Sequence, residues 1–167
     1  MTVTDHLSLR RAGPADAVAI DALTQAAYAR WVPIIGRKPR PMTVDYALAV
    51  REHLIDLLED ADGLAALIEL AVEPDHVLIV NLAVAPARQG QGLGSRLLAH
   101  AEEVARDHGR PLLRLYTNRL MTTNIALYRS RGYAVDREEE YAPGGVAVHM
   151  SKPVPAEAAL AASKSPR

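Results

Sequence analysis

The stretch VLIVNLAVAPARQGQGLGSRLL, from Val77 to Leu98, decides the fold of this chain. It begins with an apolar run over residues 77–85, which only Asn81 interrupts and which Pro86 ends. A short apolar run bounded by a proline is typical of a strand, and its continuity predicts that both faces of that strand are buried.

A glycine-rich loop follows the predicted strand. Gly90, Gly92 and Gly94 lie in it, and apolar residues then recur every three or four positions until Gly109, where a helix C-cap glycine is expected. Glycines let a ligand approach the backbone, and a helix N-terminus offers free N–H groups and a partial positive charge. The order strand, loop, helix therefore predicts an anion site, although a glycine-rich turn without a ligand has the same pattern.

Two familiar phosphate-binding patterns do not fit this loop. A nucleoside-triphosphate loop needs a lysine directly after its last glycine, whereas Ser95 and Arg96 follow Gly94 here. A dinucleotide fingerprint needs G-x-G-x-x-G and an acidic residue about 20 positions later. The glycines are spaced differently, and Arg110 stands at that distance.

Two other motifs carry a resemblance to a known family. Gln89-x-x-Gly92-x-Gly94 resembles the pyrophosphate-binding motif of the Gcn5-related N-acetyltransferases, the GNAT superfamily. Downstream, the stretch from Asn124 through Tyr128 to Gly132-Tyr133 is similar to the second motif of that family, at the usual distance from the first.

The resemblance implies an α/β (α+β) GNAT fold. It has a mixed central sheet of about 6–7 strands, about four flanking helices and a splay between the strands at 77–85 and 112–117. The family order is strand, two helices, three strands, helix, strand, helix and two strands. We expect one domain over residues 1–151 and a disordered tail over 152–167, because residues 151–167 lack an apolar face.

Local patterns place the other elements. We expect strands at 6–12, 53–58, 64–72, 111–117, 133–135 and 146–150. We expect a helix at 16–29 and a second helix that is capped by Thr43 and ends at about 50–52. A third helix is expected at 124–131, with Thr122 or Thr123 as its cap. Asp62-Gly63 is the expected hairpin turn, and the proline-rich segment 30–41 is expected to be a loop.

The family's site residues carry over by position. The resemblance implies that the cofactor, acetyl-CoA, is held by residues on the strand, in the loop and on the second motif: Asn81, Leu82, Ala83, Val84, Arg88, Gln89, Gly90, Gln91, Gly92, Leu93, Gly94, Ser95, Asn124 and Tyr128. Arg96 follows the motif, and either Arg88 or Arg96 is available to a phosphate. Leu82 N–H is the expected donor to the acetyl oxygen, and Tyr128 the expected acid for the leaving thiolate.

The acceptor side and the base are less defined. Tyr28, Trp31 and Tyr46 are the candidate substrate contacts, with a core-anchoring role the alternative for Trp31. Many relatives carry a glutamate on the central strand, but Val80 stands before Asn81 here. The remaining candidates for the general base are Glu69, Asp75, His76, 138–140 and a water chain.

Composition narrows the function classes. The chain has 167 residues, 49% of them hydrophobic, a net charge of −1 and no cysteine. We therefore expect no disulfide, no metal site and no nucleic-acid partner. No 18-residue apolar segment is present and residues 1–11 are too polar for a signal peptide, so we expect no membrane partner and a cytoplasmic location.

Three functions follow from the resemblance. The first is an acetyl-CoA-dependent N-acetyltransferase acting on a primary amine of a small molecule. The second is an enzyme that acetylates a protein N-terminus or lysine, and the third is a non-catalytic acyl-CoA-binding sensor. A longer acyl donor stays open, and a homodimer is a further expectation, since dimers are frequent in the family.

Overall fold

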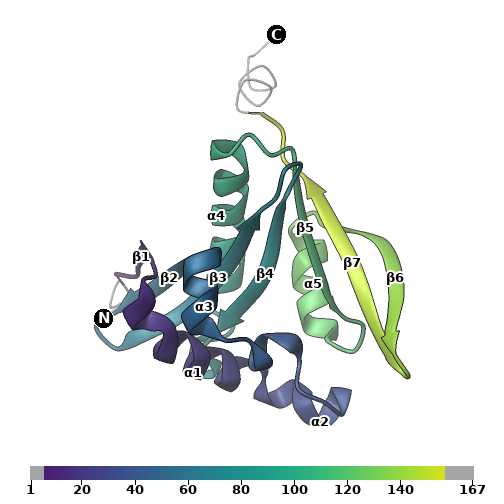
Figure 1. The fold of residues 1–167 in the computed structure, drawn as a ribbon, viewed down its shortest axis with the longest axis horizontal. Coiled ribbons are helices and arrows are strands. Elements are labelled where there is room, and N and C mark those ends of the chain that lie inside the picture. The colour runs from purple at the N-terminus through teal and green to yellow at the C-terminus, as the bar shows by residue number, and fades with distance from the viewer. Residues whose placement is uncertain (1–5, 157–167) are drawn as a thin grey trace. The chain divides into compact units, whose positions relative to one another are not determined.

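The computed structural model describes residues 6–156. It contains seven strands in the order β1-β2-β3-β4-β5-β7-β6, together with helices α1 to α5 (Figure 1). Its described residues form two compact units, 6–71 with 80–97 and 72–79 with 98–156, so β4 and α4 each contribute to both. No helix within residues 6–156 has the length and hydropathy needed to cross a membrane.

The first unit contains the antiparallel part of the sheet. Its elements are β1 (Ser8–Arg11), α1 (Ala17–Tyr28), α2 (Val32–Ile35), α3 (Tyr46–Glu52), β2 (Leu54–Asp60), β3 (Gly63–Val72) and the end of β4 (Val77–Val84). β2 pairs antiparallel with both β1 and β3, and α1 packs against α3 (Figure 1). The core of this unit comes from α1, β2 and β3, where seven large apolar side chains are at most 1% exposed: Ile20, Ile55, Leu57, Leu58, Leu67, Ile68 and Leu70.

The segment predicted as a loop, residues 30–41, is largely helical. It contains the end of a 3-10 turn at Ala29–Trp31, the short α2 and the start of a second 3-10 turn at Arg40–Thr43. Pro33 does not interrupt α2, because a proline in the first turn removes only an N–H that lacks a helical partner. Gly36 ends α2 with a φ of 82°, in the left-handed region that favours glycine.

The predicted cap of the next helix is wrong. Thr43 is the last residue of the second 3-10 turn, and its hydroxyl donates to the Arg40 carbonyl at 2.8 Å. The cap of α3 is Asp45, whose carboxylate accepts the Ala47 N–H at 3.0 Å. The hairpin turn is also displaced by one residue, to 61–62, and Gly63 begins β3.

The second unit contains the start of β4 and the C-terminal elements. These are the larger part of α4 (Leu93–Asp107), β5 (Leu112–Asn118), α5 (Thr122–Ser130), β6 (Ala134–Ala142) and β7 (Gly145–Pro153). Val77 and Leu78 pair in parallel with β5, as expected, while β7 pairs antiparallel with both β5 and β6. The expected splay further along β4 stays a prediction.

Three predictions for this unit need correction. Neither Thr122 nor Thr123 caps α5, because both lie inside the helix and its N-cap is Met121. The final two strands are much longer than predicted. β6 is an edge strand with eight consecutive exposed residues. Its charged run 138–140 has no apolar alternation, so the sequence pattern did not indicate a strand there. Charged side chains are common on edge strands, where they discourage pairing with another chain.

The first residues of the predicted C-terminal tail lie in β7. Lys152 pairs with Leu113 in the sheet, and its ammonium lies 2.5 Å from a carboxylate oxygen of Glu102. Residues 152–153 therefore belong to β7. Of the rest of the predicted tail, Val154 is buried, and residues 157–167 lie outside the described residues.

Candidate active site

The central strand β4 exposes its two faces differently. Val77, Ile79, Asn81 and Ala83 are buried, whereas the residues between them are partly exposed. The prediction of burial on both faces is therefore wrong. Regular alternation places Asn81 on the buried face and Leu82 on the partly exposed one.

The glycine-rich loop has the backbone geometry of an anion site. Gly90 and Gly92 both have a φ of 78°, and a Cβ added to either would meet no atom within 4 Å. The loop leads into α4 at Leu93, and the Arg96 N–H donates to the Gly92 carbonyl at 3.0 Å as the helix begins. The N–H groups before Arg96 are those that a helix N-terminus leaves without an intrahelical partner. Open space, left-handed glycines and a helix N-terminus therefore fit a pyrophosphate.

The polar side chains around the loop have partners of their own. Arg88 donates to the Asp60 carboxylate at 2.8 Å and to the Gln91 side-chain oxygen at 3.2 Å. The hydrogen bond from Arg88 to Asp60 holds the pKa of Asp60 below its usual value. Gln89 donates to the Val84 carbonyl at 3.3 Å, and Arg96 to the Leu7 carbonyl at 3.4 Å. Arg88 thus fastens the loop to the end of β2.

A buried polar cluster surrounds Asn81. Its side-chain oxygen accepts the Tyr28 hydroxyl at 2.9 Å, and its nitrogen donates to Thr24 at 3.2 Å and to Tyr46 at 3.1 Å. The Tyr28 hydroxyl also lies 3.2 Å from the Leu82 carbonyl oxygen. Burial raises the pKa of Tyr46 to about 12, so this phenol is protonated at neutral pH.

The three predicted substrate contacts are all buried. Tyr28, Trp31 and Tyr46 are 8%, 5% and 3% exposed. The guanidinium carbon of Arg30 lies over the Trp31 ring, 4.3 Å from the ring centroid. The burial of Trp31 favours the alternative that this side chain anchors the segment to the core. The hydroxyls of both tyrosines are held in the cluster around Asn81, and direct contact with an acceptor stays a prediction.

Several of the candidate bases have close partners. Glu69 is only 1% exposed, and one of its carboxylate oxygens lies 2.7 Å from Nδ1 of His53. The other oxygen has no hydrogen-bond partner among the residues that the structure describes. His76, in the second unit, contacts the exposed carboxylate of Asp75. Sequence reasoning missed His53, because no pattern connects it to a glutamate on another element.

The second motif forms the helix α5. Asn124 is half-buried, and Tyr128 is 6% exposed with its ring 5.9 Å from that of Tyr133. Burial raises the pKa of Tyr128 to about 12. Within residues 6–156 the Tyr128 hydroxyl forms no hydrogen bond, so a protonated donor is available.

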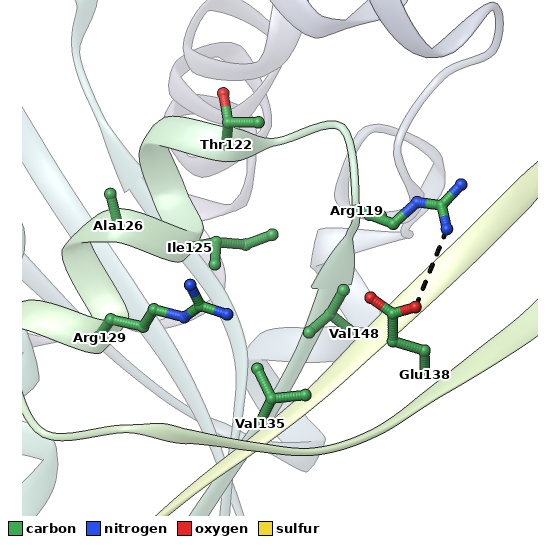
Figure 2. Close-up of a pocket in the computed structure, with 8 residues that line it drawn as sticks. All are labelled: Arg119, Thr122, Ile125, Ala126, Arg129, Val135, Glu138 and Val148. Atoms are coloured by element: carbon green, nitrogen blue, oxygen red, sulfur yellow. Dashed lines mark ion pairs between the residues drawn. The ribbon is translucent and has the colours of Figure 1, made fainter.

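A different face of α5 lines a pocket that the sequence did not indicate (Figure 2). The pocket has a volume of about 650 Å³ and lies against β6 and β7. Its apolar side chains are Ile125, Ala126, Val135 and Val148. Charged groups also line it, and Arg119 lies 3.8 Å from Glu138.

Comparison with known proteins agrees with these motifs. Residues 20–133 match the model of the Acetyltransferase (GNAT) family, which is more than half of the chain. The chain therefore belongs to the GNAT acetyltransferase family. The mixed seven-stranded sheet with about four main helices is the fold expected from the resemblance.

Individual relatives are more distant. The chain is similar to an IAA acetyltransferase of Azospirillum brasilense, with 35% identity over 89 residues, and the match spans 52% of this chain and 58% of that relative. The ribosomal-protein-S18-alanine N-acetyltransferase of Escherichia coli has a similar structure, with a TM-score of 0.73, 25% identity and coverage of 89% and 94% of the two chains. A GNAT acetyltransferase of Elizabethkingia anophelis with acetyl-CoA bound shares the fold, with a TM-score of 0.69, 15% identity and coverage of 90% and 99%.

Proposed function

We propose that this enzyme transfers an acetyl group from acetyl-CoA to a primary amine of a small molecule. The observation that carries the proposal is the loop from Gln89 to Ser95, where left-handed glycines and the N-terminus of α4 offer backbone N–H groups around open space. A pyrophosphate of a CoA thioester has the charge that such a site selects.

The residues divide into two sets by role. The first set binds acetyl-CoA. The backbone N–H groups of residues 89–95 hold the pyrophosphate, with Arg88 beside them. Residues 81–84 pair with the pantetheine arm, and Asn124 contacts the cofactor from α5. The second set acts on the reacting atoms, and it consists of Leu82 and Tyr128. This assignment rests on the position of each residue in the two motifs or in the strand and turn that precede the first motif.

The chemistry requires one donor for the oxygen and one proton for the sulfur. Leu82 N–H donates to the acetyl oxygen, where negative charge develops as the amine attacks the carbonyl carbon. The C–N bond forms, the C–S bond breaks, and the thiolate takes the proton of Tyr128. The proton that the new amide nitrogen loses then returns to Tyr128, so the enzyme ends unchanged.

A small acceptor is favoured by the segment between α1 and α3. Its turn at 40–43 contacts α1, and Trp31, in the turn at Ala29–Trp31, is buried. A protein N-terminus is the second candidate, supported by the structural similarity to the ribosomal-protein-S18-alanine N-acetyltransferase. That candidate would use the same loop and the same Leu82 and Tyr128.

Release of free CoA thiol from acetyl-CoA tests both candidates. The acceptors are a panel of polyamines, amino acids, aminoglycosides and arylalkylamines, and a second panel of peptides with a free N-terminal alanine or a lysine. We expect at least one small amine to raise thiol release about 100-fold above hydrolysis, as positioning of two reactants allows. Acetylation of peptides alone would overturn the small-molecule assignment, and thiol release by no acceptor would overturn the proposed transfer.

A further inference from the structure

We propose that Thr24, Tyr28 and Tyr46 are positioning residues that hold the Leu82 peptide through Asn81, so that its N–H stays aimed at the acetyl oxygen. The inference rests on the proposed function, in which Leu82 N–H is the oxyanion donor. It gives a functional role to Thr24, which lies in neither motif. It also gives Tyr28 and Tyr46 a role that needs no contact with the acceptor.

The hydrogen bonds fix which way the Asn81 amide points. The Tyr46 hydroxyl donates its proton to the Pro41 carbonyl at 2.7 Å, so it can only accept from Asn81. The amide nitrogen must therefore face Tyr46 and Thr24, and the oxygen must face the Tyr28 hydroxyl. Both N–H bonds of the amide are used, and rotation by a half turn would place its oxygen against the Tyr46 oxygen.

The same cluster restrains the backbone on both sides of the proposed donor. The peptide that carries the Leu82 N–H joins Asn81 to Leu82. On one side, the Asn81 side chain has three partners, and on the other the Tyr28 hydroxyl lies 3.2 Å from the Leu82 carbonyl oxygen. Tyr28 thus bridges the side chain of one residue and the backbone of the next.

Burial makes these restraints stiff. Asn81 and Tyr46 are 3% exposed and Thr24 is 0% exposed, so no water replaces a lost partner without rearrangement. A hydrogen bond in such surroundings is stronger than one in water, and an unpaired amide there is costly. An oxyanion donor accelerates a reaction only if it is already oriented when charge develops. The cluster supplies that orientation from the buried face of β4, opposite the face of Leu82.

The test uses the vibration of the acetyl carbonyl, which a merely structural role would not move. Acetyl-CoA with carbon-13 at the carbonyl is bound to the full chain, and its stretching frequency is compared with that of free acetyl-CoA. The variants are Thr24→Val, which keeps the shape and removes the hydroxyl, and Thr24→Ser, which keeps the hydroxyl. Tyr46→Phe provides a second break in the cluster if Thr24→Val does not fold.

We expect wild type to lower the carbonyl frequency, Thr24→Val and Tyr46→Phe to return it toward the free value, and Thr24→Ser to match wild type. With an amine acceptor, kcat should fall about 10-fold in Thr24→Val, less than the roughly 100-fold loss on removing an oxyanion donor. The KM for acetyl-CoA should change by less than about two-fold, since the pyrophosphate loop is untouched.

The outcomes separate the two proposals. A lowered frequency in wild type that persists in Thr24→Val and Tyr46→Phe would overturn the positioning role and leave the proposed function standing. An unshifted frequency of bound acetyl-CoA in wild type would show that Leu82 does not polarise the carbonyl, and the positioning role and the donor role of Leu82 would then both be wrong, whereas the proposed acetyl transfer is overturned only if no acceptor causes thiol release. A loss in Thr24→Val that Thr24→Ser fails to restore would also count against the hydroxyl.

Discussion

Two buried tyrosines in the second unit have similar surroundings and different expected roles. The rings of Tyr128 and Tyr133 meet edge to face with centroids 5.9 Å apart. Burial raises the pKa of both hydroxyls, that of Tyr128 to about 12. Among the residues that the structure describes, neither hydroxyl has a hydrogen-bond partner. Both tyrosines belong to the second motif, but only Tyr128 stands at the position expected to supply the proton to the thiolate, so the pair provides a matched comparison.

Removal of the Tyr128 hydroxyl should slow turnover rather than weaken binding. We expect Tyr128→Phe to lower kcat by about 100-fold, the low end for loss of a general acid, with little change in the KM for acetyl-CoA. Tyr133→Phe loses a buried hydroxyl of the same kind and should keep wild-type kcat. Steady-state kinetics of the two variants measures this difference, and equal kcat values in Tyr128→Phe and wild type would remove Tyr128 as the acid.

The pH dependence follows from the same shift. Because the pKa of Tyr128 is raised to about 12, its hydroxyl stays protonated at neutral and moderately alkaline pH. Its proton is lost only as the pH rises through that value. Tyr128 should therefore cause no fall in rate below about pH 11.

At the residue scale, the two motifs were readable in the sequence and the cluster around Asn81 was not. Gln89, Gly92, Gly94 and Tyr128 occur at fixed spacings because one ligand is expected to contact them all. Thr24 is 57 residues before Asn81, and a threonine on the buried face of a helix has no pattern that names its partner.

At the scale of elements, the start of α3 shows how a helix cap can be misplaced. Thr43 and Asp45 are both good cap residues, and the hydroxyl of Thr43 is already engaged with the preceding turn. A sequence pattern cannot distinguish them without knowing where that turn ends. The structure assigns the cap to Asp45.

Replacement of each candidate cap should therefore have different effects on stability. We expect Asp45→Ala to lower the free energy of unfolding by about 1 kcal/mol, because the Ala47 N–H loses its acceptor. Asp45→Ser restores a capping side chain and should recover most of that loss. Urea unfolding measures both, and a larger effect of Thr43→Val than of Asp45→Ala would contradict the assigned cap.

The order of elements was predictable where hydrophobic periodicity was strong, and less so at the edge of the sheet. β3 and α4 have buried apolar positions that a pattern detects. β6 is exposed over eight of its nine residues and is held by backbone pairing to β7. Because few of its side chains are buried, its sequence lacks the apolar alternation that would reveal its full length. The helical turns between α1 and α3 were hidden by prolines that helices tolerate in their first turn.

At the scale of the whole molecule, the family match covers residues 20–133 and therefore includes parts of both units. The loop at residues 89–95 lies in the first unit, and Asn124 and Tyr128 lie in the second. Binding of acetyl-CoA to the folded chain should raise the stability of the whole. At a ligand concentration of about 100 times Kd, the expected gain is about 2.7 kcal/mol.

Substitution of two glycines, Gly92 in the loop and Gly109 outside it, tests whether the loop is responsible for this gain in stability. Gly92 and Gly109 have φ values of 78° and 65°, and a Cβ added to either meets no atom within 4 Å. An aspartate at either position therefore carries the same charge and a similar backbone strain. Only at position 92 would it lie against the pyrophosphate.

Thermal unfolding with and without acetyl-CoA, on wild type, Gly92→Asp and Gly109→Asp, is the most direct test of the central claim. NAD and ATP serve as control ligands. We expect acetyl-CoA alone to raise the Tm of wild type and of Gly109→Asp, and to leave that of Gly92→Asp unchanged. A rise of the same size in Gly92→Asp, or no rise in wild type, would contradict a cofactor site in this loop.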